Sequence, residues 1–135
     1  MDMSKFQSQH NDAAAQIATL EALMAKPNLD PVEASEALII LASRLNFHLS
    51  MEDKFLYPKA ALSTDTVLRE LAQKMQTEMS GLSEEFVRYV KKWTPNEIGS
   101  HPNEFIDHSK RVVAALKDRI HREETQFYPL IQTSL

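Results

Sequence analysis

The sequence predicts an all-α protein, and two observations support this fold class. Only two glycines, Gly81 and Gly99, occur in the 135 residues, whereas sheets joined by tight turns usually need several residues with positive φ. Four long segments carry apolar residues three and four positions apart, which is the spacing of an amphipathic helix. Because short proline- or serine-containing breaks separate these segments, we expect an antiparallel up-down-up-down four-helix bundle.

The apolar spacing and the break residues set the bounds of each helix. The predicted helices cover residues 4–26, 31–57, 65–93 and 102–128. Pro27 ends the first helix, and the second has the best start signal, because Asp30 is a good N-cap and Pro31 suits the first helical position. Pro95 closes the third helix, and the fourth begins around Pro102.

Composition limits the class of protein. A chain of 135 residues with 43% hydrophobic residues fits one compact domain over residues 1–135. The chain has no cysteine, so zinc fingers, iron–sulfur clusters and cysteine nucleophiles are excluded, and any metal site must use nitrogen and oxygen ligands.

Charge and hydropathy address the partners and the cellular location. A net charge of -4 without a cluster of lysine and arginine argues against nucleic acid and against an anionic membrane surface as partners. The longest apolar run, residues 37–42, is too short to cross a bilayer, and residues 1–15 lack the apolar core of a signal peptide. We therefore expect a soluble, cytoplasmic protein.

An internal repeat relates the second helix to the fourth. Residues 45–58 align with residues 116–129 without a gap, and the identical pairs are Leu45/Leu116, Glu52/Glu123, Tyr57/Tyr128 and Pro58/Pro129. The two segments therefore look like two copies of one element. In this alignment His48 corresponds to Arg119.

Several ionisable side chains fall on the predicted apolar faces. They are His10 in the first helix, His48 and Glu52 in the second, Glu78 in the third, and Arg119 and Glu123 in the fourth. Burial of an uncompensated carboxylate costs on the order of several kcal/mol, so such a set requires a counter-charge. Three carboxylates against one guanidinium leave two negative charges, which one divalent ion would balance.

Two arrangements would supply the counter-charge. In the first, the two histidines, Glu52 and Glu123 hold a metal ion, and the His-x-x-x-Glu spacing of the second helix places imidazole and carboxylate on one face. In the second, Arg119 neutralises Glu78 and Glu123 in a salt-bridge network without metal. Glu78 is a metal ligand in one case and a partner of Arg119 in the other.

These residues resemble those of the bacterial hemerythrin-like, or HHE cation-binding, domains. The matching elements are His10, residues 48–53 with Tyr57-Pro58, and Glu123-Glu124 with Tyr128-Pro129. The resemblance implies a four-helix bundle with a non-haem di-iron centre, in a family whose members bind oxygen, sense oxygen or iron, or serve in nitrosative and oxidative stress. It also implies that His10 and His48 are terminal ligands of one metal, and that Glu52 and Glu123 are bridging carboxylates.

Arg119 departs from this family pattern. The family has a ligand histidine four residues before the second glutamate, where this chain has Arg119, whose guanidinium cannot ligate a metal and carries a fixed positive charge. We therefore expect a reduced site with one metal ion or fewer. Iron is the first choice, and manganese and zinc are alternatives.

The expected function follows from this reduced site. We predict binding or sensing of a metal ion, oxygen or a related small diatomic ligand. The chain offers no nucleophile–base pair and no phosphate-binding loop, so we expect no enzymatic activity. The alternative is a metal-free helical interaction module that retains a buried network of arginine, glutamate and histidine.

Overall fold

The computed structural model describes residues 1–135, and every regular element in it is helical. The α-helices are α1 (Ser4–Met24), α2 (Pro31–Met51), α3 (Tyr57–Ala61), α4 (Thr66–Glu78), α5 (Leu82–Lys92), α6 (Pro95–Ser100), α7 (Pro102–Arg122) and α8 (Tyr128–Ser134). Two π-helical segments, η1 (Glu52–Leu56) and η2 (Glu123–Phe127), connect α2 to α3 and α7 to α8. The predicted all-α class is therefore confirmed.

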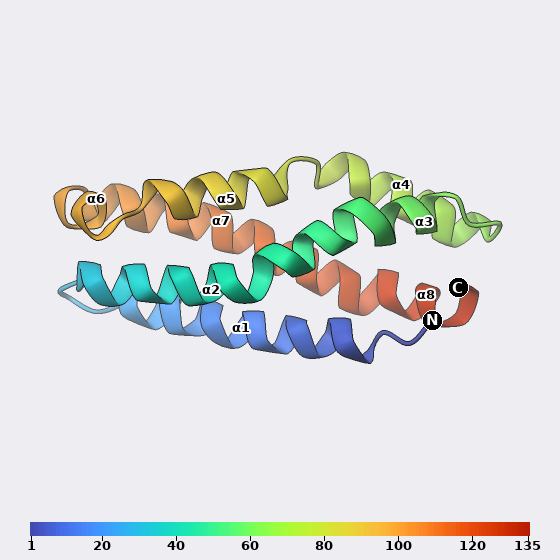
Figure 1. Ribbon diagram of the computed structural model, residues 1–135, viewed down its shortest axis with the longest axis horizontal. Helices are drawn as coiled ribbons and strands as arrows, with labels where there is room; N and C mark the ends of the chain where they lie inside the picture. Colours follow the sequence, from blue (N-terminus) through green and yellow to red (C-terminus); the bar gives the residue numbers. More distant parts are fainter.

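The longer helices run side by side along the long axis of the molecule (Figure 1). α2 returns along α1, α3 then continues beside α4, and the path from α7 to α8 ends near the N-terminus. The ammonium group of Met1 donates a hydrogen bond of 2.7 Å to the carbonyl oxygen of Leu135. The two ends of the chain therefore meet at one end of the molecule.

The helix starts follow from local sequence signals. Asp30 accepts hydrogen bonds from the backbone N–H groups of Val32 and Glu33, at 2.9 and 3.3 Å, and Pro31 occupies the first turn of α2. These contacts satisfy N–H groups that have no partner within the helix.

The two π-helical segments are a feature that the sequence spacing does not predict. In each copy of the repeat, the tyrosine N–H bonds to the carbonyl five residues earlier, from Tyr57 to Glu52 and from Tyr128 to Glu123. A proline follows each tyrosine, lacks an N–H, and crowds the carbonyl four residues before it, which a widened turn relieves. The helices therefore continue beyond Pro58, instead of ending there as predicted.

The predicted third helix over residues 65–93 is wrong as a single element. Residues 79–81 separate α4 from α5, and Gly81 has φ 84°, a backbone conformation that favours glycine. The short helix α6 was also not predicted. It begins where the Thr94 side chain accepts a hydrogen bond from the N–H of Glu97.

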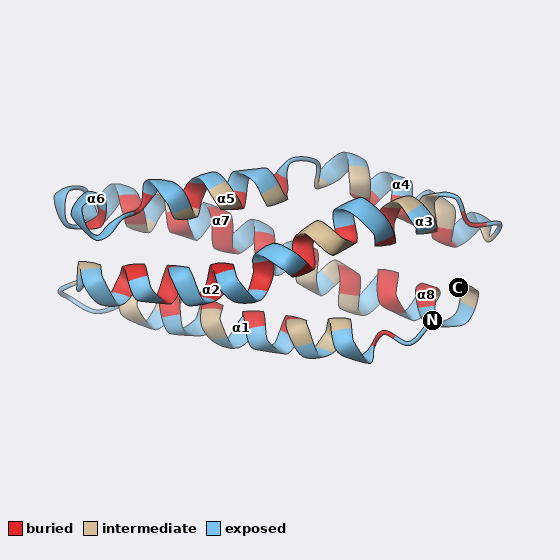
Figure 2. Ribbon diagram, viewed as in Figure 1, coloured by how far each residue is buried: buried red, intermediate tan, exposed pale blue.

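The apolar core has two parts, with a layer of polar residues between them along the chain. Residues such as Leu41, Phe86 and Leu116 form one part, and residues such as Met75 and Phe127 form the other. In Figure 2, buried and exposed residues alternate along each long helix, as expected when one side of a helix packs against its neighbours. None of the helices is both long enough and apolar enough to span a bilayer.

Candidate metal centre

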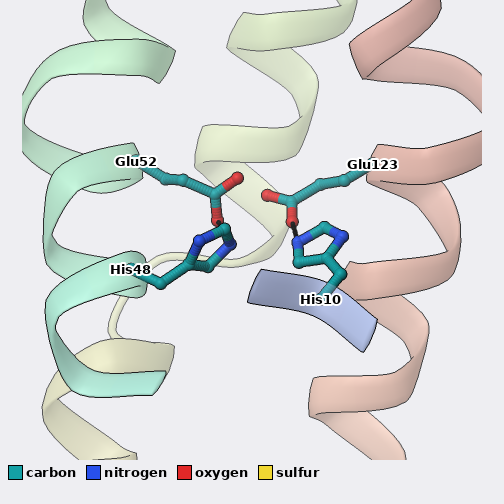
Figure 3. Close-up of side chains that lie close together, drawn as sticks. All are labelled: His10, His48, Glu52 and Glu123. Atoms are coloured by element: carbon teal, nitrogen blue, oxygen red, sulfur yellow. Dashed lines mark ion pairs between the residues drawn. The ribbon is translucent and has the colours of Figure 1, made fainter. Parts of the chain in front are cut away.

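Four of the five predicted ligands lie together in the polar layer between the two parts of the core (Figure 3). His10 comes from α1, His48 from α2, and Glu52 and Glu123 are the first residues of η1 and η2. Each is at most 2% exposed. One ligand atom from each of the four residues lies within 4.8 Å of the others.

The imidazole of His48 has a defined tautomer. Its Nδ1 lies 2.6 Å from Oε1 of Gln9, and because an amide oxygen only accepts, Nδ1 carries the hydrogen. Burial, and next the positive charge of His10, lower the pKa of His48 to about 4, so the ring is neutral. Its Nε2 atom therefore carries a lone pair. This atom lies 3.1 Å from Oε1 of Glu52 and has no hydrogen-bond partner.

His10 is held from both sides of its ring. Its Nδ1 lies 2.7 Å from Oε1 of Glu124, and its Nε2 lies 2.9 Å from Oε1 of Glu123 and 2.9 Å from the hydroxyl of Tyr128. Burial alone would lower the pKa of His10, but hydrogen bonding and charge from Glu123, with the charge of Glu52, raise it overall. The ring therefore holds a proton beside the carboxylates, at a position where a bound cation would replace that proton.

The carboxylates of Glu52 and Glu123 are fully buried, and each accepts a hydrogen bond from a tyrosine of the other repeat copy. The hydroxyl of Tyr57 donates to Oε2 of Glu123 at 2.6 Å, and the hydroxyl of Tyr128 donates to Oε2 of Glu52 at 2.5 Å. Burial raises the pKa of both carboxyl groups, the charge of Glu52 raises that of Glu123 further, and Arg119 acts in the opposite direction on both. Each tyrosine thus fixes the carboxylate of the other repeat copy.

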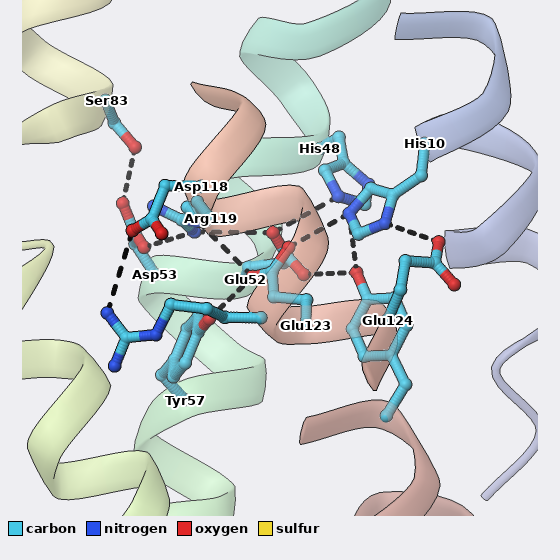
Figure 4. Close-up of polar contacts among 12 residues, drawn as sticks. His10, His48, Glu52, Asp53, Tyr57, Ser83, Asp118, Arg119, Glu123 and Glu124 are labelled. Carbon is cyan, nitrogen blue, oxygen red and sulfur yellow. Dashed lines mark hydrogen bonds and ion pairs between the residues drawn. The ribbon is translucent and has the colours of Figure 1, made fainter. Parts of the chain in front are cut away.

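Arg119 lies on the opposite side of the carboxylates from the two imidazoles (Figure 4). Its Nη2 lies 2.7 Å from Oδ1 of Asp53 and 3.3 Å from Oε1 of Glu52, and its Nε lies 3.3 Å from Oε2 of Glu123. Its carbon Cζ lies 5.3 Å from the ring centroid of Tyr57, within the range of a cation–π contact. Burial opposes the charge, but Glu123 and Glu52 raise the pKa of Arg119, so the buried guanidinium is charged.

The prediction that Glu78 points into the core is wrong. Its side chain is 42% exposed, and its Oε2 lies 2.6 Å from Nη2 of Arg122. The reason is the end of α4, where the buried positions are Ala72 and Met75, and the helix stops at Glu78 before the break. The predicted ion pair between Glu78 and Arg119 is therefore replaced by one with Arg122, outside the cluster.

Three residues that hold the site were not assigned from the sequence. Each of them is the sequence neighbour of an inward-facing residue, so its side chain is turned about 100° around the helix from that residue. The three are Gln9, Asp53 and Glu124. From there Gln9 and Glu124 reach the two imidazoles, and Asp53 reaches both Arg119 and the hydroxyl of Ser83 on α5. The signal available in the sequence was a polar residue beside each inward polar residue.

The donor set fits a cation. Three buried side-chain atoms in the chain have no hydrogen-bond partner, and all three belong to this site. Two of them, Nε2 of His48 and Oε1 of Glu123, are acceptors, and the third is Nη1 of Arg119. Nε2 of His10 lies 2.9 Å from this glutamate oxygen as an ion-pair contact, and a bound cation would take the place of its proton. Buried acceptors without a donor are rare in proteins, and a metal ion would satisfy both of these at once.

Two imidazoles and two carboxylates converge in the interior of this all-helical fold. Such a set of donor atoms is typical of a cation-binding protein. The model of the Hemerythrin HHE cation binding domain family matches residues 2–131. The chain therefore belongs to this family, which confirms the resemblance inferred from its sequence. Neither the curated proteins nor the solved structures gave a match to this chain.

Proposed function

We propose that the chain binds a single metal ion through His10, His48, Glu52 and Glu123. The observation that carries this proposal is Nε2 of His48, a buried acceptor without a donor, which lies 3.1 Å from Oε1 of Glu52. Gln9 and Glu124 orient the imidazoles through their Nδ1 atoms, the arrangement in which histidines usually ligate metals.

The proposal of one ion rests on Arg119. With Glu78 outside the site, the fully buried charges are Glu52 and Glu123 against Arg119 and the protonated His10. Once a metal ion has replaced the proton of His10, one negative charge remains, instead of the two expected from the sequence. The partly exposed Asp53 and Glu124 add negative charge at the edge of the site. One divalent ion is compatible with this balance, whereas a second would be repelled by the guanidinium and would lack an imidazole.

Two nitrogen and two oxygen donors suit iron, with manganese and zinc as alternatives. A bound iron ion would supply a coordination position for oxygen or another small diatomic ligand. The protein then acts in binding or sensing such a ligand, or the metal itself, and not in catalysis. We also propose that α1, α2 with α3, α4 with α5, and α7 with α8 form the arms of an antiparallel four-helix bundle around this site.

A metal-free network is the second candidate function. It is favoured by Arg119, whose guanidinium reaches Glu52, Asp53 and Glu123 without help from any ion. In that case the buried charges would fix the packing of the helices, and the chain would act through its surface as an interaction module.

Metal titration of the purified chain distinguishes the two candidates. We expect the chelator-treated protein to bind Fe(II), Mn(II) or Zn(II) in calorimetry. His48→Ala should weaken this binding by roughly a hundredfold, because removing a ligand should lower the metal affinity more than removing a residue that only supports a ligand. His121→Ala is the matched control, because His121 lies exposed on α7. Equal binding by wild type and His48→Ala would reject the metal site in favour of the metal-free network.

A further inference from the structure

The exposed apolar residues of this chain are concentrated on one helical path. Eight large hydrophobic residues are exposed, and six of them lie on α2, on η1 or directly after α3. These six residues form the outer stripe and are Val32, Ile39, Ile40, Phe47, Phe55 and Leu62. Phe47 is 66% exposed and Leu62 is 85% exposed, so these side chains add little to the packing of their own chain.

The outer stripe is a continuous face of the helix. Figure 1 shows α2, η1 and α3 as one uninterrupted helical path. Ile39 and Ile40 are adjacent, and the other steps along the stripe are seven or eight residues, which is about two helical turns. The extra residue in η1 keeps Phe55 and Leu62 on the same side as Val32, opposite the buried residues such as Leu41 and Leu45. The stripe therefore faces away from the core along its whole length.

Apart from Ile40, the outer stripe is symmetric about Phe47. Ile39 and Phe55 each stand eight residues from Phe47, and Val32 and Leu62 each stand fifteen residues from it. A two-fold axis at Phe47 would pack two such helices antiparallel, with each residue of a pair against its counterpart in the second chain. We propose that the outer stripe is the interface of a homodimer with this antiparallel, isologous arrangement.

The charges along the stripe agree with this symmetry. Glu36 stands eleven residues before Phe47 and Lys59 stands twelve residues after it, so the two-fold axis brings them together across the interface. Lys54 likewise comes opposite Ile40, over which its aliphatic stem packs. None of Glu36, Lys54 and Lys59 forms an ion pair within its own chain.

The residues around Phe47 leave room for a second aromatic ring. Ser43 precedes Phe47 by four residues and Ser50 follows it by three, so two small side chains flank the proposed axis on the same face. The ring of one Phe47 can therefore lie over the serines of the other chain. This packing explains why the phenylalanine at the centre of the stripe has small polar neighbours.

The size of the stripe sets the expected affinity. Its length is about 45 Å at 1.5 Å per residue, and a helix width of about 12 Å gives a contact on the order of 500 Å² per chain. Stable interfaces bury about 800 Å² per partner, and smaller ones are weaker. We therefore expect a dissociation constant on the order of micromolar.

Sedimentation of the full chain tests the dimer. We expect a monomer–dimer equilibrium in the micromolar range, and a roughly hundredfold weakening by Phe47→Glu, because this central contact faces its own copy. Val67→Glu is the matched control, since Val67 is 63% exposed on α4 and lies outside the stripe. A chain that stays monomeric well above micromolar concentration, or a dimer that Phe47→Glu leaves intact, would overturn the proposal.

Charge reversal and a distance measurement test the orientation. Glu36→Lys and Lys59→Glu should each weaken the dimer, and the double variant should restore it, whereas additive losses would contradict the pairing. The chain has no cysteine, so Leu62→Cys accepts a single nitroxide label. The antiparallel dimer predicts about 45 Å between the two labelled helix ends, and a short distance would indicate a parallel dimer and reject this one.

Discussion

The two copies of the repeat, residues 45–58 and 116–129, share a backbone but carry different chemistry. Each contains a glutamate at the start of a π-helical segment, and each tyrosine donates to the glutamate of the other copy. Four residues before the glutamate, the first copy has His48 and the second has Arg119. One copy therefore offers a free lone pair beside its carboxylate, whereas the other offers a positive charge.

The difference extends to the neighbouring helices. Glu124 in the second copy holds His10 of α1, whereas the corresponding Asp53 in the first copy holds Arg119 and the hydroxyl of Ser83 on α5. Beside the second copy, α1 supplies the imidazole of His10, whereas beside the first copy α5 supplies only the hydroxyl of Ser83. A nearly symmetric scaffold thus carries a one-sided donor set.

Removing the guanidinium is expected to have the largest effect on stability. Arg119→Ala leaves Glu52 and Glu123 buried without their cation, and loss of one partner of a buried charge pair costs roughly 3–5 kcal/mol. Urea unfolding in the presence of a chelator measures this loss. Addition of a divalent ion should recover part of it, because the ion replaces the missing positive charge.

Arg122→Ala provides the control for this substitution. Arg122 lies on the same helix as Arg119, but its partners Glu78 and Asp118 are partly exposed, and exposed ion pairs contribute about 1 kcal/mol or less. If the two arginine variants lost equal stability, the guanidinium of Arg119 would not be the main counter-charge of the buried carboxylates.

The two tyrosine hydroxyls should contribute unequally. The hydroxyl of Tyr128 forms hydrogen bonds with both Glu52 and His10, whereas the hydroxyl of Tyr57 forms one with Glu123 alone. A hydrogen bond to a charged group contributes about 1.5–3 kcal/mol, so we expect Tyr128→Phe near the upper value and Tyr57→Phe near the lower. Chemical denaturation of both variants measures the order, and a larger loss for Tyr57→Phe would show that the two copies differ in the opposite sense.

Glu78→Ala should have the smallest effect. The carboxylate of Glu78 pairs with Arg122 at the surface and is 42% exposed, so we expect a loss below about 1 kcal/mol. We also expect unchanged metal binding, measured by the same calorimetric titration as for the wild type. Weaker metal binding in this variant would show that Glu78 is a ligand, and would contradict its placement at the surface beside Arg122.

Periodicity and the repeat were enough to bring the central residues of the site together. His10, His48, Glu52 and Glu123 lie far apart in the chain, but each occupies a position on an apolar face, and burial follows from that pattern. Arg119 was placed correctly for the same reason. The repeat also identified both tyrosines, although not the exchange of their hydrogen bonds between copies.

The remaining features depend on local backbone changes that spacing does not encode. Glu78 was misplaced because a regular stripe was extended through Gly81, where the helix breaks and the register restarts. The π-helical segments shift the residues that follow them by one position, and only Pro58 and Pro129 hinted at this change. Lateral partners such as Gln9 depend on which helices are neighbours, so they need the fold first.

The metal content of the purified wild-type chain is the most direct test of this one-sided site. Elemental analysis after expression in iron-supplemented medium should give about one equivalent or less, because the buried charge and the free donors suit a single ion. Arg119→His, which rebuilds the His-x-x-x-Glu pair of the other copy, should raise this value. Two equivalents of iron in the wild-type chain would contradict the account, because Arg119 would then not stand in the place of a second metal ion.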